Sequence, residues 1–161
     1  AYPQARRSVR YAFRKQDSFD RARLRDFAAA LPGGYALRRI DEGLYHLAAQ
    51  EDWSHDLVSQ YPVWEDYAAH GMGYAVLQDG ALVCGASSYA DWPDGIEVEI
   101  DTHPAHRRRG LARACAAALI LDCLSRGLHP SWDAANGISA HLAQTLGYVP
   151  AGAYPVYEWM L

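Results

Sequence analysis

The stretch IDTHPAHRRRGLARA, residues 100–114, decides how the rest of the sequence is interpreted. It joins a segment of alternating apolar and acidic residues to a long run rich in alanine, which is the pattern of a strand followed by a helix. Three consecutive arginines and Gly110 lie between them. A helix that begins after such a turn presents unpaired backbone N–H groups at the positive end of its dipole. We therefore expect the turn to bind an anion, and the arginine side chains favour a phosphate.

The residues before this turn indicate a sheet. The segment IEVEIDT, residues 96–102, alternates strictly, which predicts a strand with Glu97, Glu99 and Asp101 on one face. Before it, GYAVLQDGALVCGASSYA contains two apolar runs joined by Asp79 and Gly80. This dipeptide supplies the positive φ angles of a tight turn, so an antiparallel hairpin is expected.

The residues after the turn predict three further elements. The helix expected over residues 110–126 carries no charge from 114 to 121, so most of its surface should be buried, and Gly127 should end it. The segment HPSWDA reads as a short strand, NGISAHLAQTLG as an amphipathic helix ending at Gly147, and YVPAGAYPVYEWML as one or two final strands.

The first seventy residues predict strands and helices in alternation. The expected elements are a strand at SVRYAFRK, a capped helix within residues 17–33 that ends at Pro32 and Gly33, a strand at residues 35–40, and helices around LYHLAAQ and VWEDYAAHG separated by a loop or broken helix at EDWSHDLVSQYP. The whole order indicates a mixed α/β or α+β fold with a single sheet.

Charge is distributed unevenly over the 161 residues, which suit one compact domain. The formal net charge is +7 for residues 1–40, −13 for residues 41–106 and +2 for residues 107–161. Such an acidic middle segment would repel nucleic acid and attract a cationic ligand, although an ordinary solvated acidic surface is the alternative. We expect no nucleic-acid partner.

Several classes of protein are not expected from this sequence. No apolar run is long enough to span a membrane and the first ten residues lack the apolar core of a signal peptide, so we expect a cytoplasmic protein without a membrane partner. The three cysteines are predicted to be reduced, buried thiols. The histidines show no metal-ligand spacing, so no metal is predicted. Because the chain begins with Ala1, it is expected to be processed, trimmed or part of a longer protein.

The segment HPAHRRRGLA resembles the acetyl-CoA pyrophosphate loop of the GNAT superfamily of N-acetyltransferases. The signature of that loop is Gln or Arg, two residues, Gly, one residue, then Gly or Ala, and Arg107, Gly110 and Ala112 occupy these places. NGISAHLAQTLGY is similar to the helix that follows the fifth strand of the family. GASSYA, EIDTHPAHRRRGLARACAAALI and PSWDAAN are similar to a subgroup that includes an antibiotic-resistance acetyltransferase.

The resemblance implies a fold and a cofactor. The fold would be a mixed, mainly antiparallel central sheet flanked by helices, splayed between the fourth strand, at residues 96–102, and the fifth, at residues 131–133. Residues 35–161 would form the acetyl-CoA-binding domain, and residues 1–34 an N-terminal strand and helix extension. The residues implied in acetyl-CoA binding are Ile100 and Thr102 for the pantetheine arm, Arg107, Arg108, Arg109, Gly110, Leu111 and Ala112 for the pyrophosphate, and Asn136 and Ser139 from the other side of the cleft.

Acetyl transfer to an amine requires a base for the amine and a proton for the leaving thiolate. Glu97 and Glu99 are the candidate bases, acting directly or through water, and Glu97 lies nearer the family's usual distance from the loop. The alternative is that both carboxylates face solvent or pair with arginines. Many relatives carry a tyrosine acid where this chain has Ala143. Another tyrosine, Tyr148, Tyr154 or Tyr157, or the solvent could supply that proton.

The resemblance therefore implies an acetyl-CoA-dependent N-acetyltransferase that acts on a primary amine of a small cationic acceptor. The alternative is a module of the same fold that binds acyl-CoA as a sensor or scaffold without catalysis. The expected partner is a small-molecule amine. The end YPVYEWML could pair across a homodimer or close a sheet within one chain.

Overall fold

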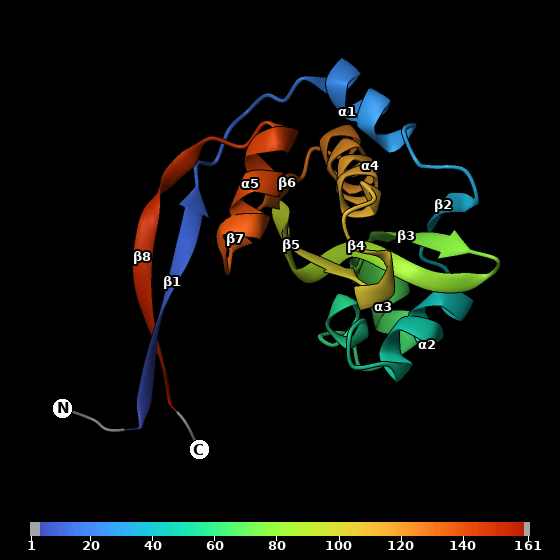
Figure 1. Ribbon diagram of the computed structural model, residues 1–161, viewed down its shortest axis with the longest axis horizontal. Helices are drawn as coiled ribbons and strands as arrows, with labels where there is room; N and C mark the ends of the chain where they lie inside the picture. The colour runs from blue at the N-terminus through green and yellow to red at the C-terminus, as the bar shows by residue number, and fades with distance from the viewer. Residues whose placement is uncertain (1–3, 160–161) are drawn as a thin grey trace. The chain divides into compact units, whose positions relative to one another are not determined.

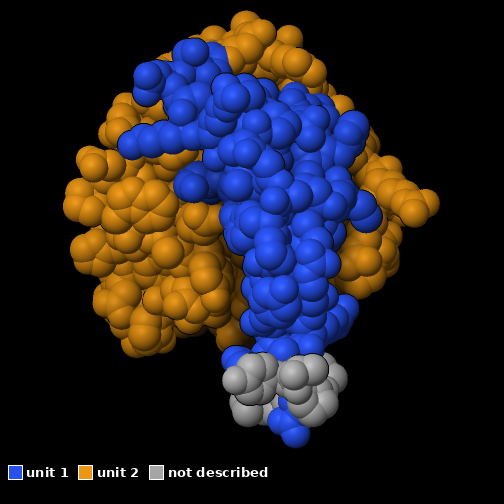
Figure 2. Space-filling model, turned by 90° about the vertical axis from the view of Figure 1, so that its left-hand side faces the viewer, with its two compact units in different colours: residues 1–19, 131–161 blue, residues 20–130 orange. Residues whose placement is uncertain are grey.

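The structure, a computed structural model, describes residues 4–159 (Figure 1). The chain forms two compact units, which Figure 2 shows in separate colours: one combines residues 1–19 with residues 131–161, and the other is continuous over residues 20–130. Among the described residues, no helix is both long and apolar enough to cross a membrane.

The five-stranded sheet has the order β2-β3-β4-β5-β6. Its strands are β2 (Tyr35–Arg39), β3 (Gly73–Gln78), β4 (Ala81–Trp92), β5 (Gly95–Thr102) and β6 (His129–Ser131). The pairings from β2 to β5 are antiparallel, so the sheet is mainly antiparallel, as predicted. Asp79 and Gly80, with φ angles of 50° and 80°, make the predicted hairpin turn between β3 and β4.

Helices cover both faces of this sheet within the larger unit (Figure 1). One face carries α4 (Leu111–Ser125), against which α1 (Arg21–Ala28) packs. The other carries α2 (Glu42–Gln50), the 3-10 helix η1 (His55–Leu57) and α3 (Trp64–His70). Neighbouring residues of β4 point to opposite faces: Cys84 faces Cys115 of α4, which lowers the Cys84 pKa, whereas a Cβ on Gly85 would lie 2.5 Å from Leu57 of η1.

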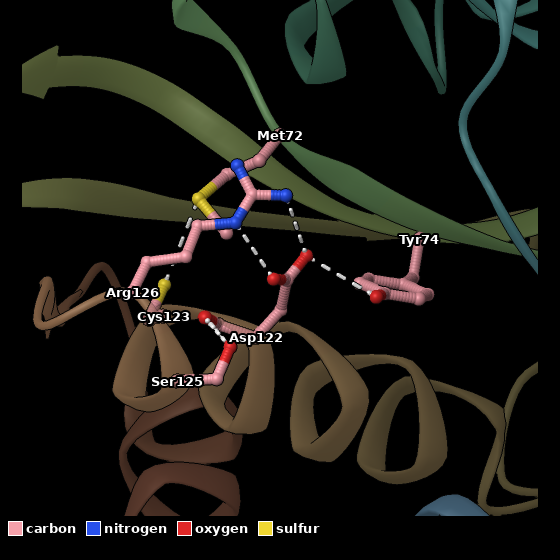
Figure 3. A network of polar contacts seen from close by, with 6 residues as sticks. All are labelled: Met72, Tyr74, Asp122, Cys123, Ser125 and Arg126. Atoms are coloured by element: carbon pink, nitrogen blue, oxygen red, sulfur yellow. Dashed lines mark hydrogen bonds and ion pairs between the residues drawn. The ribbon is translucent and has the colours of Figure 1, made fainter.

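Helix α4 is anchored to the sheet at its C-terminal end (Figure 3). The Asp122 carboxylate accepts hydrogen bonds from Tyr74 of β3, at 3.2 Å, and from Arg126, at 2.8 Å. The predicted burial of the helix is confirmed, because Leu119 and Ile120 are fully buried in its middle. The three cysteines are free and buried, also as predicted. The firm C-terminal anchor fixes where the opposite end of α4, with the arginine turn, begins.

The smaller unit contains a second sheet of order β7-β1-β8. Its elements are β1 (Ala5–Phe13), β7 (Asp133–Ala134), α5 (Gly137–Leu146) and β8 (Pro150–Trp159), and its strands pair antiparallel. Tyr148 is 3% exposed and packs its ring against Phe13, Phe19 and Trp132. This aromatic cluster is the core of the unit.

The prediction of a single sheet, with HPSWDA as one strand, is wrong. The segment divides at Trp132 into β6 and β7, which belong to different sheets. The cause is packing: the Trp132 ring joins the aromatic cluster at Tyr148, and its Nε1 donates to Ser139. Alternation of residue types cannot reveal this change of partner.

Other predicted boundaries shift by a few residues. The first strand starts at Ala5 rather than Ser8, and α1 ends at Ala28, before Pro32 and Gly33, because the chain turns there and Ala30 donates to the Phe27 carbonyl. Gly71, Gly127 and Gly147 lie at or just past the ends of α3, α4 and α5, as predicted. The final strand is described only to Trp159, so the last two residues of YPVYEWML lie outside the described residues. The division at residue 34 stays a prediction.

Candidate functional site

The arginine turn leads into a helix, as the sequence predicts. After β5 the chain forms the short helix η2 (Pro104–His106), the turn from Arg107 to Gly110, and then α4. Gly110 is the N-cap of α4, with a φ of 75° and no side-chain capping bond. The backbone N–H groups of Leu111 and Ala112 have no acceptor inside the helix. They are therefore available to an anion at the positive end of the helix dipole.

The backbone of the turn is strained at one residue. Arg108 has a φ of 62°, in the left-handed region where an L-residue with a Cβ costs about 1–2 kcal/mol. Such conformations cluster at ligand-binding sites, where the surrounding structure holds them. The strain at Arg108 and the glycine conformation at Gly110 together shape the turn.

A side chain from β2 holds the turn from outside. The Tyr35 hydroxyl accepts a hydrogen bond from the Arg109 guanidinium and lies 2.9 Å from Nδ1 of His106. Arg109 can only donate, so the Tyr35 oxygen accepts from it and keeps its proton and a second lone pair for the hydrogen bond with His106 Nδ1. Tyr35 thus fixes the position of two residues around the turn, a role that the sequence does not indicate.

The three acidic residues of β5 share one face of the sheet, as alternation predicts. Glu97, Glu99 and Asp101 lie opposite Ala90, Ser87 and Gly85 of β4, and the register of the two strands shifts between Ser88 and Ala90. Each acidic side chain is partly buried. Bulges of this kind often lie next to active sites, where they re-aim side chains.

The electrostatics of this face centre on Asp101. Its Oδ2 atom is buried and has no hydrogen-bond partner among residues 4–159. Burial raises the pKa of Asp101, a hydrogen bond with Glu99 lowers it, and the charge of Asp56 raises it again. Leu57, packed over Gly85, brings Asp56 of η1 to this face. The result is a concentration of carboxyl groups that a cation would stabilise.

The predicted pantetheine-binding residues lie on β5 as well. Ile100 pairs with Ala86 and Thr102 with Cys84 along the edge that faces β4. On the other side, His129 at the start of β6 donates to Asp94, at 2.8 Å, next to the first residue of β5. Strand β6 has 3 residues and β5 has 8, so β6 is too short to pair along all of β5. The role of Ile100 and Thr102 stays a prediction.

The remaining predicted residues belong to the smaller unit. Asn136 is the N-cap of α5 and accepts a hydrogen bond from the Ser139 backbone, at 2.9 Å, while the Ser139 hydroxyl accepts from Trp132. These contacts account for both residues structurally, and their role toward a cofactor stays a prediction. Ala143 is fully buried in α5 and supplies no proton. Of the candidate tyrosines, Tyr148 is buried and the Tyr154 hydroxyl donates to Asp133.

Over residues 4–159, no group of three or more His, Cys, Asp or Glu side chains is arranged to hold a metal ion.

Comparison with known proteins places this arrangement in a family. A family model described as GNAT acetyltransferase matches residues 2–157. A crystal structure of a GCN5-related N-acetyltransferase-like protein from Streptococcus suis is similar at a TM-score of 0.95 and 45% identity, covering 98% of this chain and 64% of that one.

Two curated relatives are also named as acyltransferases that act on nitrogen. The chain is 32% identical over 136 residues to the Bacillus subtilis protein named uncharacterized N-acetyltransferase YdfB, covering 79% of this chain and 49% of the relative. It is 29% identical over 121 residues to L-amino acid N-acyltransferase MnaT of Escherichia coli, covering 70% of each. The chain thus spans about half the length of the first of these relatives.

Proposed function

Since the chain belongs to the GNAT acetyltransferase family, we propose that it is an acetyl-CoA-dependent N-acetyltransferase for a primary amine of a small cationic acceptor. The observation that carries this proposal is the turn before α4. There a glycine N-cap in the left-handed conformation leaves helix-start amides without internal acceptors, beside three arginines. A diphosphate is the anion that suits both features.

The residues present fit acetyl-CoA as a substrate. The amides from Arg107 to Ala112 would hold the diphosphate, and Arg109, positioned by Tyr35, would add a charged hydrogen-bond donor. The part of β5 that β6 cannot reach would pair with the amide groups of the pantetheine arm through Ile100 and Thr102. Acetyl-CoA then supplies an acetyl group activated as a thioester.

The acid-lined face of β5 supports a cationic acceptor. Burial raises the pKa of Asp101, the Glu99 side chain lowers it, and repulsion by the Asp56 charge raises it again. An ammonium or guanidinium group of the acceptor would relieve that repulsion. The name of the relative L-amino acid N-acyltransferase supports an acceptor of small size.

The reaction requires the attacking amine to lose a proton, and we assign this step to Glu97, with Glu99 as the alternative. Both side chains lie on the same face of the strand whose backbone would pair with the substrate. Glu99 also interacts with Asp101 and lowers the pKa of that carboxyl. The thiolate would take its proton from solvent, because a thiol has an ordinary pKa of about 8.5 and needs little assistance near neutral pH.

The test of this function is the release of free thiol from acetyl-CoA over a panel of amines. We expect wild-type protein to release thiol with diamines and other cationic amines. Glu97→Gln should lower kcat by about 10²–10⁴-fold, the usual effect of losing a general base. Glu99→Gln should have a smaller effect.

A matched control is Glu65→Gln, which removes the same charge from an exposed position in α3. Equal rates for Glu97→Gln, Glu65→Gln and wild type would exclude the assigned base. Loss of the reaction in Glu99→Gln alone would transfer the role to Glu99.

The alternative function is acyl-CoA binding without catalysis. Ala143 favours it, since a buried methyl group stands where many relatives have a tyrosine acid. The same thiol assay separates the two: a sensor or scaffold would bind acetyl-CoA and release no thiol above the uncatalysed rate with any amine. A homodimer and a cytoplasmic location stay predictions.

A further inference from the structure

An arginine outside the predicted site lies directly beside the arginine turn. Arg113 is the third residue of α4, where the positive end of the helix dipole disfavours a cation. The first turn of α4 contains no acidic residue to offset this charge. A terminal guanidinium nitrogen of Arg113 lies 3.7 Å from the position that a Cβ on Gly110 would take. The side chain therefore reaches back to the turn itself.

The position of Arg113 is set by an aromatic residue of another helix. Its guanidinium carbon lies 4.6 Å from the ring centroid of Phe27 in α1, within cation–π distance. Arg23 of α1 contacts the same ring, at 5.3 Å. Phe27 thus gathers two cationic side chains next to a turn that already holds three arginines.

Among the residues that the structure describes, Arg23 and Arg113 lack the carboxylate partners that usually neutralise clustered arginines. Within the described range 4–159, neither Arg23 nor Arg113 forms an ion pair with a carboxylate, and the buried Nε of Arg113 has no hydrogen-bond partner. Like charges gathered around one ring repel each other unless an anion lies between or beside them. A bound anion beside the two guanidinium groups would offset this repulsion.

The chemistry of the cofactor indicates which anion this is. Coenzyme A carries a diphosphate and a separate phosphate monoester on the 3′-oxygen of its ribose. In the proposed function, the amides and arginines of the turn hold the diphosphate. A guanidinium is well suited to the remaining phosphate monoester, which accepts two hydrogen bonds from one arginine.

We infer that Arg113, held in place by Phe27, binds the 3′-phosphate of acetyl-CoA and gives the protein its preference for coenzyme A over 3′-dephospho-coenzyme A. This inference rests on the proposed function. Arg113 is then a cofactor-binding residue, and Phe27 is a positioning residue that acts through it.

The test compares the affinities of coenzyme A and 3′-dephospho-coenzyme A by calorimetry. Wild-type protein should bind coenzyme A about tenfold more tightly or better, the effect of a charged hydrogen-bonded pair. Arg113→Gln should bring the two affinities within about twofold by weakening only the binding of coenzyme A. Arg113→Lys, which keeps the charge, should restore part of the preference. Arg25→Gln, an exposed arginine of the same helix as Phe27, is the matched control and should keep it in full.

Phe27 is tested by the same ratio of affinities, which a purely structural role would not alter. Phe27→Leu should reduce the preference, and Phe27→Tyr, which keeps an aromatic ring, should retain it. The inference is overturned if Arg113→Gln keeps the wild-type ratio of the two affinities, even when both affinities fall. It is also overturned if the wild-type protein binds coenzyme A and 3′-dephospho-coenzyme A equally well. If wild type binds neither compound, the proposed function fails with it; binding of both without discrimination rejects the role of Arg113 alone.

Discussion

At the scale of single residues, Asp101 shows how the site stores unfavourable charge. Its Oδ2 atom is buried without a hydrogen-bond partner in the described part of the chain, and its pKa is raised by burial and by Asp56. The folded pKa therefore lies above the unfolded value of about 3.9. The native state binds more protons than the unfolded state between these two values, so stability falls as pH rises through this window.

Asp101→Asn is expected to stabilise the protein at neutral pH, because the amide keeps the shape and removes the desolvated charge. The gain should be fully present above the folded pKa and should fade as pH falls from that value toward about 4, below which the wild-type carboxyl is neutral in both states. Urea unfolding midpoints measured from pH 4 to pH 8 check this. Asp52→Asn, at an exposed position, is the control and should leave the midpoint nearly unchanged. A less stable Asp101→Asn at pH 7 would contradict the assignment.

Residue patterns reveal only part of the site. The turn from Arg107 to Ala112 can be predicted from the sequence, because its backbone conformation is determined locally by Gly110 and its neighbours. The roles of Tyr35 and Phe27 cannot be predicted from residue patterns, because each contacts an arginine that is far away in the sequence. Only the packing of β2 and α1 brings each aromatic residue to its arginine. The sequence does place one unusual charge, because Arg113 lies in the first turn of the predicted helix, where the helix dipole disfavours a cation.

At the scale of elements, α4 joins the site to the core. Its C-terminal end is tied to β3 through Asp122 and Tyr74, while its N-terminal end presents the arginine turn. The side chains between them are buried on most sides, so the helix cannot tilt without opening the core. The glycine helix ends and the hairpin at Asp79 were predictable because local conformation determines them, whereas the division at Trp132 depends on distant packing.

Truncation of the middle of α4 should therefore be costly. Leu119 is fully buried, and Leu119→Ala should lower the free energy of unfolding by about 2–5 kcal/mol through lost burial and the resulting cavity. Leu47→Ala serves as the control, because Leu47 in α2 is 43% exposed and its truncation should have a small effect. Both are measured by denaturation in urea. A loss below about 1 kcal/mol for Leu119→Ala would show that α4 is not held by its core contacts.

At the scale of the whole molecule, composition and order of elements predict the fold class but not the division of the chain into two units. The antiparallel sheet and its helices follow from local periodicity. The pairing of β1 with β8 joins the two ends of the sequence, which no local pattern encodes. The Streptococcus suis structure shares nearly the whole of this chain yet is longer, so the choice of acceptor by the whole protein stays part of the proposal.

The central claim is that the turn before α4 holds the diphosphate of acetyl-CoA, and calorimetric titration of the protein with acetyl-CoA tests it most directly. We predict saturable binding at one site with a dissociation constant of about 50 μM or lower, since the amides at Gly110 and the neighbouring arginines are already in place. Absence of binding at that concentration, by protein whose fold is intact, would contradict it.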